Sequence, residues 1–307
     1  MGVHAGILQR MTQAEPTAPM ETRMLPLRDG YEAHARLWRP KSPRGAVLYL
    51  HGIQSHGGWY EESGRRLAAA GLTVLMPDRR GSGRNLAQRG HATSEKLCVQ
   101  DGLDMLDALR AQTGAASAHL VGVSWGGKLA AVLARETPNR VASLSLVAPG
   151  IYPIVDLKRV EKIHVAISLI NHRDRMFDIP LNDPRLFTSN PERITYFERD
   201  EWKLTQVTAS FLLASRRLDR LARRLGDSSW RGPVHLLLAG HDPIIDNAHT
   251  REWLRHLPSP DRQITEYPDA YHTLEFERDP GKFFDDLLAW VVQRCDAGGL
   301  AGAAAAR

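Results

Sequence analysis

The chain has 307 residues, of which 43% are hydrophobic and 24% are charged, and its formal net charge is +5. These values are ordinary for a globular protein with a sizeable core, folded as one large domain or two small ones. No apolar run approaches the length of a membrane span. The positive charge is too small over this length to indicate nucleic-acid binding.

The two cysteines are Cys98 and Cys295, and neither has the spacing of a metal site or of a CxxC motif. We therefore expect no disulfide framework and no bound metal, and we expect both side chains to be buried thiols. Residues 1–20 lack the apolar core of a signal peptide, so we expect a cytoplasmic protein.

Strand and helix patterns alternate along most of the chain. After an expected loose leader (residues 1–21), Asp29-Gly30 separates two strand-like runs, 24–27 and 31–38, as in a hairpin. Further strands are expected at residues 46–50, 73–76, 118–123, 141–147, 234–238 and 263–267, and helices at residues 60–70, 97–111, 128–136, 247–256 and 282–294. The alternation predicts an α/β fold with a mostly parallel sheet covered on both faces.

The alternation stops between residues 151 and 231. This segment has proline-punctuated turns and a long helical run at 202–225. We expect a helical cap (151–231) inserted into an α/β core (22–150 and 232–295) and placed over the strand ends, where open sheets bind ligands. The alternative is a separate helical domain with no part in the site. Residues 296–307 are expected to form a flexible tail.

The sequence Gly122-Val123-Ser124-Trp125-Gly126 lies between an expected buried strand and an expected helix. This pattern is typical of a nucleophile elbow, a sharp turn that exposes one serine hydroxyl above the sheet. Gly122 and Gly126 would leave room where the turn is tightest. Ser124 is therefore the candidate nucleophile; the alternative is an ordinary glycine turn.

A serine nucleophile needs a base and a group that orients the base. In chain order, Asp242 follows the strand at 234–238 and His272 follows the strand at 263–267. Asp246 is the alternative acid, although its position before a helix suits an N-cap better. A surface-loop role is the alternative for His272. His119, on the elbow strand, is expected to be structural.

An acyl-transfer site also needs donors for the developing oxyanion. We expect one to be the backbone N–H of Trp125, at a helix N-terminus. The second is expected in the loop 51–60, after the strand at 46–50, and the backbone N–H of Ile53 is our choice because Gly52 allows a close approach.

Together these features resemble the α/β-hydrolase superfamily, and most of all its monoacylglycerol lipase and lysophospholipase branch, sometimes grouped with serine aminopeptidases. The likeness runs from about residue 22 to 294. The motifs that carry it are His51-Gly52, Asp78-Arg79-Arg80-Gly81-Ser82-Gly83, the Ser124 elbow, Gly240-His241-Asp242 and Ala270-Tyr271-His272. The resemblance implies an eight-stranded sheet, a cap after the sixth strand, and Ser124, Asp242 and His272 as a catalytic triad. Two positions depart from the family pattern: Gln54 replaces a glycine beside the pocket, and Asn85 replaces a serine.

The leading hypothesis is a serine ester hydrolase that needs no cofactor and acts on a medium- or long-chain monoacyl ester. Five apolar residues of the cap are expected either to line the pocket or, as is more common at helical spacing, to form the core of the cap: Ile163, Ile167, Phe211, Leu212 and Leu213. The same fold also serves thioesterases, amidases, peptidases, C–C hydrolases, acyltransferases and non-catalytic ligand-binding proteins.

A basic cluster on one expected helix comprises Arg216, Arg217, Arg220, Arg223 and Arg224. It is either a solvated helix face or a weak contact for an anionic lipid surface or an acidic substrate. We expect no nucleic-acid partner, and the sequence does not indicate an oligomeric state.

Overall fold

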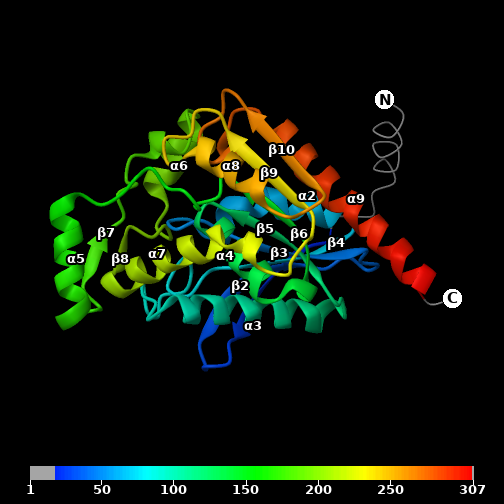
Figure 1. Ribbon diagram of the computed structural model, residues 1–307, viewed down its shortest axis with the longest axis horizontal. Helices are drawn as coiled ribbons and strands as arrows, with labels where there is room; N and C mark the ends of the chain where they lie inside the picture. The colour runs from blue at the N-terminus through cyan, green and yellow to red at the C-terminus, as the bar shows by residue number, and fades with distance from the viewer. Residues whose placement is uncertain (1–17, 306–307) are drawn as a thin grey trace.

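The structure, a computed structural model, describes the backbone of residues 18–305 and the side chains up to residue 295. One eight-stranded sheet has the order β1-β2-β4-β3-β5-β6-β9-β10 (Figure 1). Its strands are β1 (Met20–Pro26), β2 (Glu32–Trp38), β3 (Gly45–Leu50), β4 (Leu72–Pro77), β5 (Ala118–Val123), β6 (Val141–Val147), β9 (Val234–Ala239) and β10 (Arg262–Tyr267). Only β2 runs against its two neighbours, so the predicted mostly parallel α/β sheet is confirmed.

The order of the strands determines which face each connecting helix covers. The chain moves from β3 to β4 in one direction and then returns past β3 to β5, β6, β9 and β10. The helices concerned are α2 (Glu61–Ala69), α3 (Glu95–Thr113), α4 (Trp125–Glu136), α8 (Asn247–His256) and α9 (Gly281–Ala305). Because crossovers between parallel strands are right-handed, the reversal puts α2 on one face and α3, α4 and α8 on the other. In agreement, α3 packs against α4, and α9 packs against α2.

The reversal also locates the site. β3 and β5 are direct neighbours, with Leu50 in register with Gly122, and their connections leave in opposite directions. A crevice forms at the carboxyl ends of two such strands, which is where open α/β sheets bind ligands. Every residue of β4, β5 and β9 is buried, as expected for strands covered on both faces.

The ends of the fold differ from the sequence expectation. β1 begins at Met20, so the last two residues of the expected leader belong to a strand; residues 1–17 lie outside the described part of the chain. Helix α9 continues to Ala305, well into the expected tail. The alanine-rich sequence there has a high helix propensity, which outweighs its three glycines.

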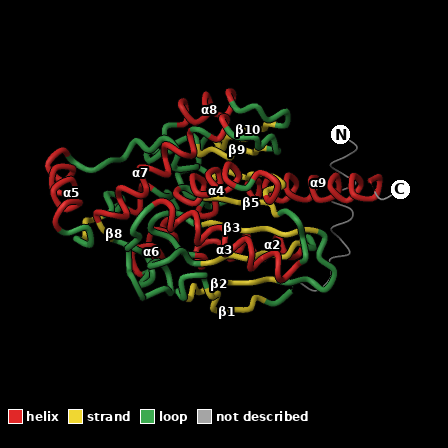
Figure 2. Tube along the Cα trace, turned by 60° about the horizontal axis from the view of Figure 1, so that its bottom comes forward, coloured by secondary structure: helices red, strands yellow, loops and turns green. Residues whose placement is uncertain are grey.

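The helical insertion after the sixth strand is present. Between β6 and β9 the chain forms α5 (Arg159–Asn171), β7 (Met176–Asp178), α6 (Pro191–Arg199), β8 (Gln206–Thr208) and α7 (Ala209–Arg223). These elements gather at one end of the molecule, whereas the C-terminal part of α9 extends from the other (Figure 2). Helix α7 packs across both α3 and α4.

The helical run expected at 202–225 is wrong for its first residues. Residues 206–208 pair with β7 as a short antiparallel ribbon, and α7 begins only at Ala209. The side chain of Thr208 accepts a hydrogen bond from the Phe211 amide and so caps the helix. Strand pairing within the cap therefore overrides the local helix propensity.

Candidate active site

Ser124 lies in the sharp turn between β5 and α4. Its backbone has φ 51° and ψ −116°, a conformation that costs energy in a residue with a Cβ. Three backbone hydrogen bonds hold it there: the Ser124 amide donates to Val147, and the Ser124 carbonyl accepts from Gly127 and Gly150 at 2.9 and 2.7 Å. This backbone geometry is typical of a nucleophile elbow.

The two elbow glycines are required by close approaches of the main chain. A Cβ on Gly122 would lie 2.6 Å from the carbonyl oxygen of Gly126, and a Cβ on Gly126 would lie 2.1 Å from that of Leu50. No side chain fits at either position without a shift of backbone. The sequence analysis did not use Gly127, although its Cβ would also collide, at 2.7 Å from Pro149.

Asp242 and His272 are brought together across the ends of β9 and β10. The Nδ1 atom of His272 lies 2.9 and 3.1 Å from the two carboxylate oxygens of Asp242, and both side chains are buried. The amides of Ile244 and Ile245 donate to the same carboxylate and fix its orientation. The alternative acid, Asp246, accepts from the His249 amide as the N-cap of α8.

The Nε2 atom of His272 is buried and has no hydrogen-bond partner among the described residues. No hydrogen bond joins it to the Ser124 hydroxyl in the described part of the chain, although Ser124 is only 9% exposed. The edge of the imidazole contacts the ring of Phe187 from the cap, with 5.8 Å between ring centroids. Catalytic hydrogen bonds in unliganded enzymes are often long and shorten when a substrate binds.

Phe187 is a contact that the sequence analysis missed. Its carbonyl also accepts a hydrogen bond from the amide of Thr273, next to His272. The segment around it carries no recognisable motif, because the contact depends on how the cap folds back over the core.

The amide of Trp125 follows Ser124 directly in the chain. The amide of Ile53 belongs to a loop that approaches Ser124, since a Cβ built on Gly52 would lie 3.4 Å from the Ser124 Cβ. Neither amide donates a hydrogen bond to another described residue. Two free N–H groups next to a serine hydroxyl are what an oxyanion hole requires.

His51 holds the loop that carries Ile53. Its Nε2 accepts from the Arg79 amide at 2.8 Å, so the proton is on Nδ1, which donates to the Gly52 carbonyl at 2.8 Å. Burial lowers the pKa of His51 to about 3, so the ring is neutral at physiological pH. The carbonyl of Gly52 belongs to the same peptide group as the Ile53 amide, which is thereby oriented.

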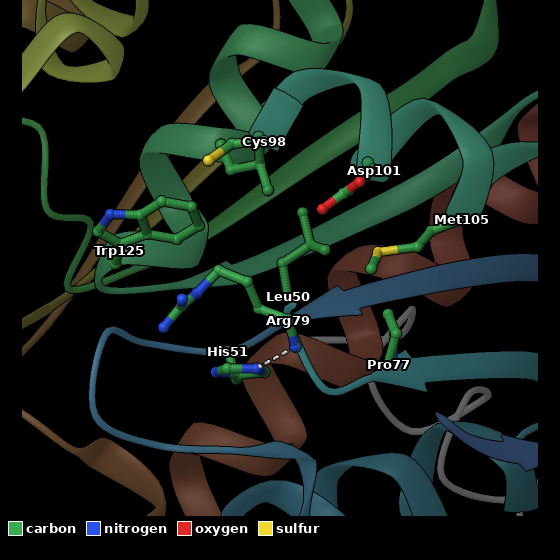
Figure 3. Close-up of a pocket in the computed structure, with 10 residues that line it drawn as sticks. Leu50, His51, Pro77, Arg79, Cys98, Asp101, Met105 and Trp125 are labelled. Atoms are coloured by element: carbon green, nitrogen blue, oxygen red, sulfur yellow. Dashed lines mark hydrogen bonds between the residues drawn. The ribbon is translucent and has the colours of Figure 1, made fainter. Parts of the chain in front are cut away.

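A small cavity lies beneath the elbow (Figure 3), lined by Leu50, His51, Pro77, Arg79, Cys98, Asp101, Gly102, Met105, Trp125 and Leu129. The volume of this cavity is only about 20 Å³. That is room for a single water molecule and not for an acyl chain.

Phe211 belongs to the buried core instead of lining a cavity: it is 1% exposed and stacks on the ring of Trp125 with 5.7 Å between centroids. Leu212 and Leu213 are half-buried. The expectation for Ile163 and Ile167 is wrong, because they are 58% and 52% exposed on α5. Helix α5 turns this face outward instead of toward the core.

His119, Cys98 and Cys295 are packed within the fold. His119 contacts Ser143 and Cys295, and burial lowers its pKa to about 4. Cys98 is buried as expected, and burial raises its thiol pKa to about 12, whereas Cys295 is only half-buried. Among the described residues, no three His, Cys, Asp or Glu side chains are grouped as metal ligands.

No helix in the described part of the chain combines the length and the apolar character that crossing a bilayer requires.

Two relatives match most of the length of the chain. Human monoglyceride lipase is 24% identical over 281 residues, which cover 89% of this chain and 91% of the relative. The monoacylglycerol lipase of Mycolicibacterium smegmatis is 24% identical over 264 residues, which cover 83% of this chain and 91% of the relative.

Solved structures share the fold. A soluble variant of monoglyceride lipase from Saccharomyces cerevisiae, in complex with a substrate analogue, superposes with a TM-score of 0.80 at 18% identity, covering 91% of this chain and 96% of that one. The monoacylglycerol lipase of Paleococcus ferrophilus superposes with a TM-score of 0.77 at 21% identity, covering 86% of this chain and 100% of that one. The profile of the family described as serine aminopeptidase, S33, matches residues 41–279. The chain therefore belongs to the serine aminopeptidase S33 family and has the α/β-hydrolase fold.

Proposed function

We propose that this protein is a serine hydrolase that cleaves carboxylic esters, with a monoacyl lipid such as a monoacylglycerol or a lysophospholipid as its substrate. Ser124 is the nucleophile, His272 the general base and acid, and Asp242 the group that orients the imidazole. The amides of Ile53 and Trp125 form the oxyanion hole.

The observation that carries this proposal is the pairing of a strained serine with a buried Asp–His pair at one sheet edge. Ser124 has a positive φ of 51°, and Nδ1 of His272 lies 2.9 Å from the Asp242 carboxylate. Such strain persists where the surrounding structure enforces it, most often at active sites. The unpartnered Nε2 atom of His272 is the acceptor that a serine proton would need.

In the proposed reaction, Ser124 Oγ attacks the ester carbonyl carbon while its proton passes to Nε2 of His272. The carbonyl oxygen becomes an oxyanion bound by the amides of Ile53 and Trp125. The tetrahedral intermediate then expels the alcohol, which takes the proton from His272, and leaves an acyl-enzyme. A water molecule, deprotonated by His272, repeats the sequence and releases the acid. Asp242 stabilises the imidazolium that forms in each half.

A lipid substrate is supported by the surroundings of the site and by the named relatives. Phe187 contacts the ring of His272 and Phe211 stacks on the ring of Trp125, so two aromatic side chains of the inserted segment surround the site with apolar contacts. We propose that residues 151–231 act as a cap over a core of residues 22–150 and 232–295. The relatives named above are a monoglyceride lipase and a monoacylglycerol lipase.

Ser124→Ala tests the nucleophile. With acyl p-nitrophenyl esters, we expect the substitution to lower kcat/KM at least about a thousandfold, because no other hydroxyl replaces Ser124. Ser117→Ala, outside the site, is the matched control and should keep the wild-type rate. A fluorophosphonate probe should label the wild type and the control but not Ser124→Ala. Equal hydrolysis by Ser124→Ala and the wild type would exclude the mechanism, and the absence of an adduct at Ser124 of the wild type would favour a ligand-binding protein.

A substrate panel tests the lipid assignment. Monoacylglycerols and lysophospholipids of increasing acyl length should be cleaved with a higher kcat/KM than acyl thioesters, acyl amides or aminoacyl peptides. Preference for a thioester or a peptide would retain the triad and replace the substrate class. Transfer of the acyl group to an added alcohol in preference to water would identify an acyltransferase.

A further inference from the structure

Arg79 is a buried cation without a counter-ion. It follows β4 at the carboxyl end of the sheet, and the residue is only 8% exposed. No carboxylate of the described residues forms an ion pair with it, whereas the neighbouring Arg80 pairs with Asp101 and Asp29. Figure 3 shows the Arg79 guanidinium pointing toward Trp125 and away from Asp101. Burial lowers its pKa to about 10, so it still carries its charge at neutral pH.

The guanidinium of Arg79 contacts both residues that supply the candidate oxyanion donors. Its Nη2 donates to the carbonyl of Ile53 at 2.8 Å. Its Cζ lies 4.8 Å from the ring centroid of Trp125 and 4.8 Å from that of Phe211, within the range of a cation–π contact. One side chain thus links the loop after β3 to the first residue of α4.

The main chain of Arg79 acts on the same loop. Its amide donates to Nε2 of His51, which sets the tautomer that lets Nδ1 donate to the Gly52 carbonyl. The peptide group before Ile53 is therefore held by His51, and the peptide group after it is held by the Arg79 side chain. The amide of Ile53 lies between these two restraints.

We propose that Arg79 is a positioning residue for the oxyanion hole: its guanidinium fixes the Ile53 carbonyl and the Trp125 ring so that both amides point at one place. This inference rests on the proposed function, because it assumes that an oxyanion forms next to Ser124. It assigns a role to a side chain that touches neither substrate nor nucleophile.

Stability gives no reason for a charge at this position. Removing a guanidinium from water without a carboxylate partner is costly, and an apolar side chain of similar length is often tolerated as well or better at such a site. We therefore expect loss of Arg79 to lower the catalytic rate, while the melting temperature stays the same or rises.

Arg79→Met and Arg79→Lys test the inference on the full chain. Arg79→Met keeps the length of the stem but removes every donor, so we expect kcat to fall about ten- to a hundredfold, with KM changed less than threefold. Arg79→Lys keeps the charge and a donor but not the planar group, so its kcat should be intermediate. Melting temperatures of both variants should lie at or above the wild-type value.

A trifluoromethyl ketone separates positioning from general disturbance. The Ser124 oxygen adds to its carbonyl carbon, the serine proton passes to His272, and the ketone oxygen becomes an oxyanion in the hole. Its inhibition constant should rise in Arg79→Met by the same factor as kcat/KM falls. Arg89→Met is the matched control, because that guanidinium also donates only to main-chain carbonyls, those of Gly83, Trp202 and Lys203. We expect it to keep kcat/KM and the inhibition constant within twofold.

Each outcome decides between the alternatives. If Arg79→Met keeps kcat/KM within twofold of the wild type, the positioning role is wrong. The role is also wrong if kcat falls while the inhibition constant does not move, or if the variant loses its fold. If the wild type itself hydrolyses no ester, the proposed function fails first, and that result is distinguishable because it does not depend on Arg79.

Discussion

Glu275 is a buried acid three residues after His272. Its carboxylate accepts hydrogen bonds from the amide and the hydroxyl of Ser63 on α2, at 3.1 and 2.6 Å. Burial raises its pKa to about 7. The loop that carries His272 is thus tied to α2 through a group that titrates near neutral pH.

This pKa predicts a stability that falls as pH rises. Between pH 4.5 and 7 the folded state keeps the proton of Glu275 and the unfolded state has lost it. The folded state therefore binds more protons, and the free energy of unfolding decreases over this window by about 3 kcal/mol. Glu275→Gln keeps an acceptor for the Ser63 amide and carries no charge, so it should remove this dependence.

Urea unfolding at pH 5, 6, 7 and 8 measures the effect. Glu275→Gln should be more stable than the wild type at pH 8 and similar to it at pH 5. Glu32→Gln, at an exposed position on β2, should follow the wild-type curve. A wild-type and a Glu275→Gln curve with the same slope would show that Glu275 does not titrate in this range.

At the scale of elements, a buried ion pair joins the elbow helix to the cap. Lys128 of α4 pairs with Asp219 of α7, and both side chains are almost fully buried. The ammonium of Lys128 and the indole N–H of Trp125 also donate to the hydroxyl of Ser215. Helix α7 is therefore fastened to α4, the helix that follows Ser124.

Breaking this pair should destabilise the protein more than replacing it. Lys128→Met leaves the Asp219 carboxylate buried without its partner, at an expected cost of about 3–5 kcal/mol in the free energy of unfolding. The double variant Lys128→Met/Asp219→Leu leaves no charge and should recover most of that loss. Chemical unfolding of the wild type, both single variants and the double variant gives the coupling. Additive losses would mean that the two groups do not depend on each other.

At the scale of the whole molecule, helix α5 presents an apolar face to solvent at the end opposite the C-terminal half of α9 (Figure 2). Val160, Ile163, Ile167 and Ile170 are 52–82% exposed and follow one side of the helix. Lys158 is the N-cap of the helix, and Arg159 and Lys162 lie in its first turn, where Lys162 pairs with Asp156. An amphipathic helix with this pattern suits shallow insertion into an anionic lipid surface. We propose it as a weak membrane contact of the cap.

The arginine cluster of α7 is a poorer candidate for that contact. Arg216 pairs with Asp156, Arg217 pairs with Glu95, and Arg223 donates to the carbonyl of Ile151. Three of the five arginines are thus engaged within the molecule, two of them in ion pairs.

Ile163→Ser/Ile167→Ser should weaken binding to vesicles of anionic phospholipid at least about tenfold, because two apolar side chains no longer enter the lipid. Its kcat on a short water-soluble ester should stay unchanged, since neither residue lies at the site. Ile264→Ser, on the exposed strand β10, is the control and should bind as the wild type does. Unchanged vesicle binding of the double variant would remove α5 from the contact.

The sequence by itself determined the fold class and the candidate nucleophile, acid and base. Buried parallel strands, the glycines beside Ser124 and the chain order of Asp242 and His272 are local patterns, and they can be recognised without knowing what packs against them. The elbow could be predicted because Gly122 and Gly126 are required by contacts with nearby main chain. Those contacts are made with residues close in the chain or on the neighbouring strand of the sheet.

The tertiary structure alone decided which distant segments meet. Arg79 has no motif of its own for this role, and its contact with Ile53 exists only because β3 and β4 are neighbours. Ile163 and Ile167 have the pattern of a buried face, yet α5 turns that face to solvent. Residues 206–208 have the sequence pattern of a helix, but they form a strand because they pair with β7. Hydrophobic periodicity reports that a face is apolar, whereas what covers that face depends on packing between elements far apart in the chain.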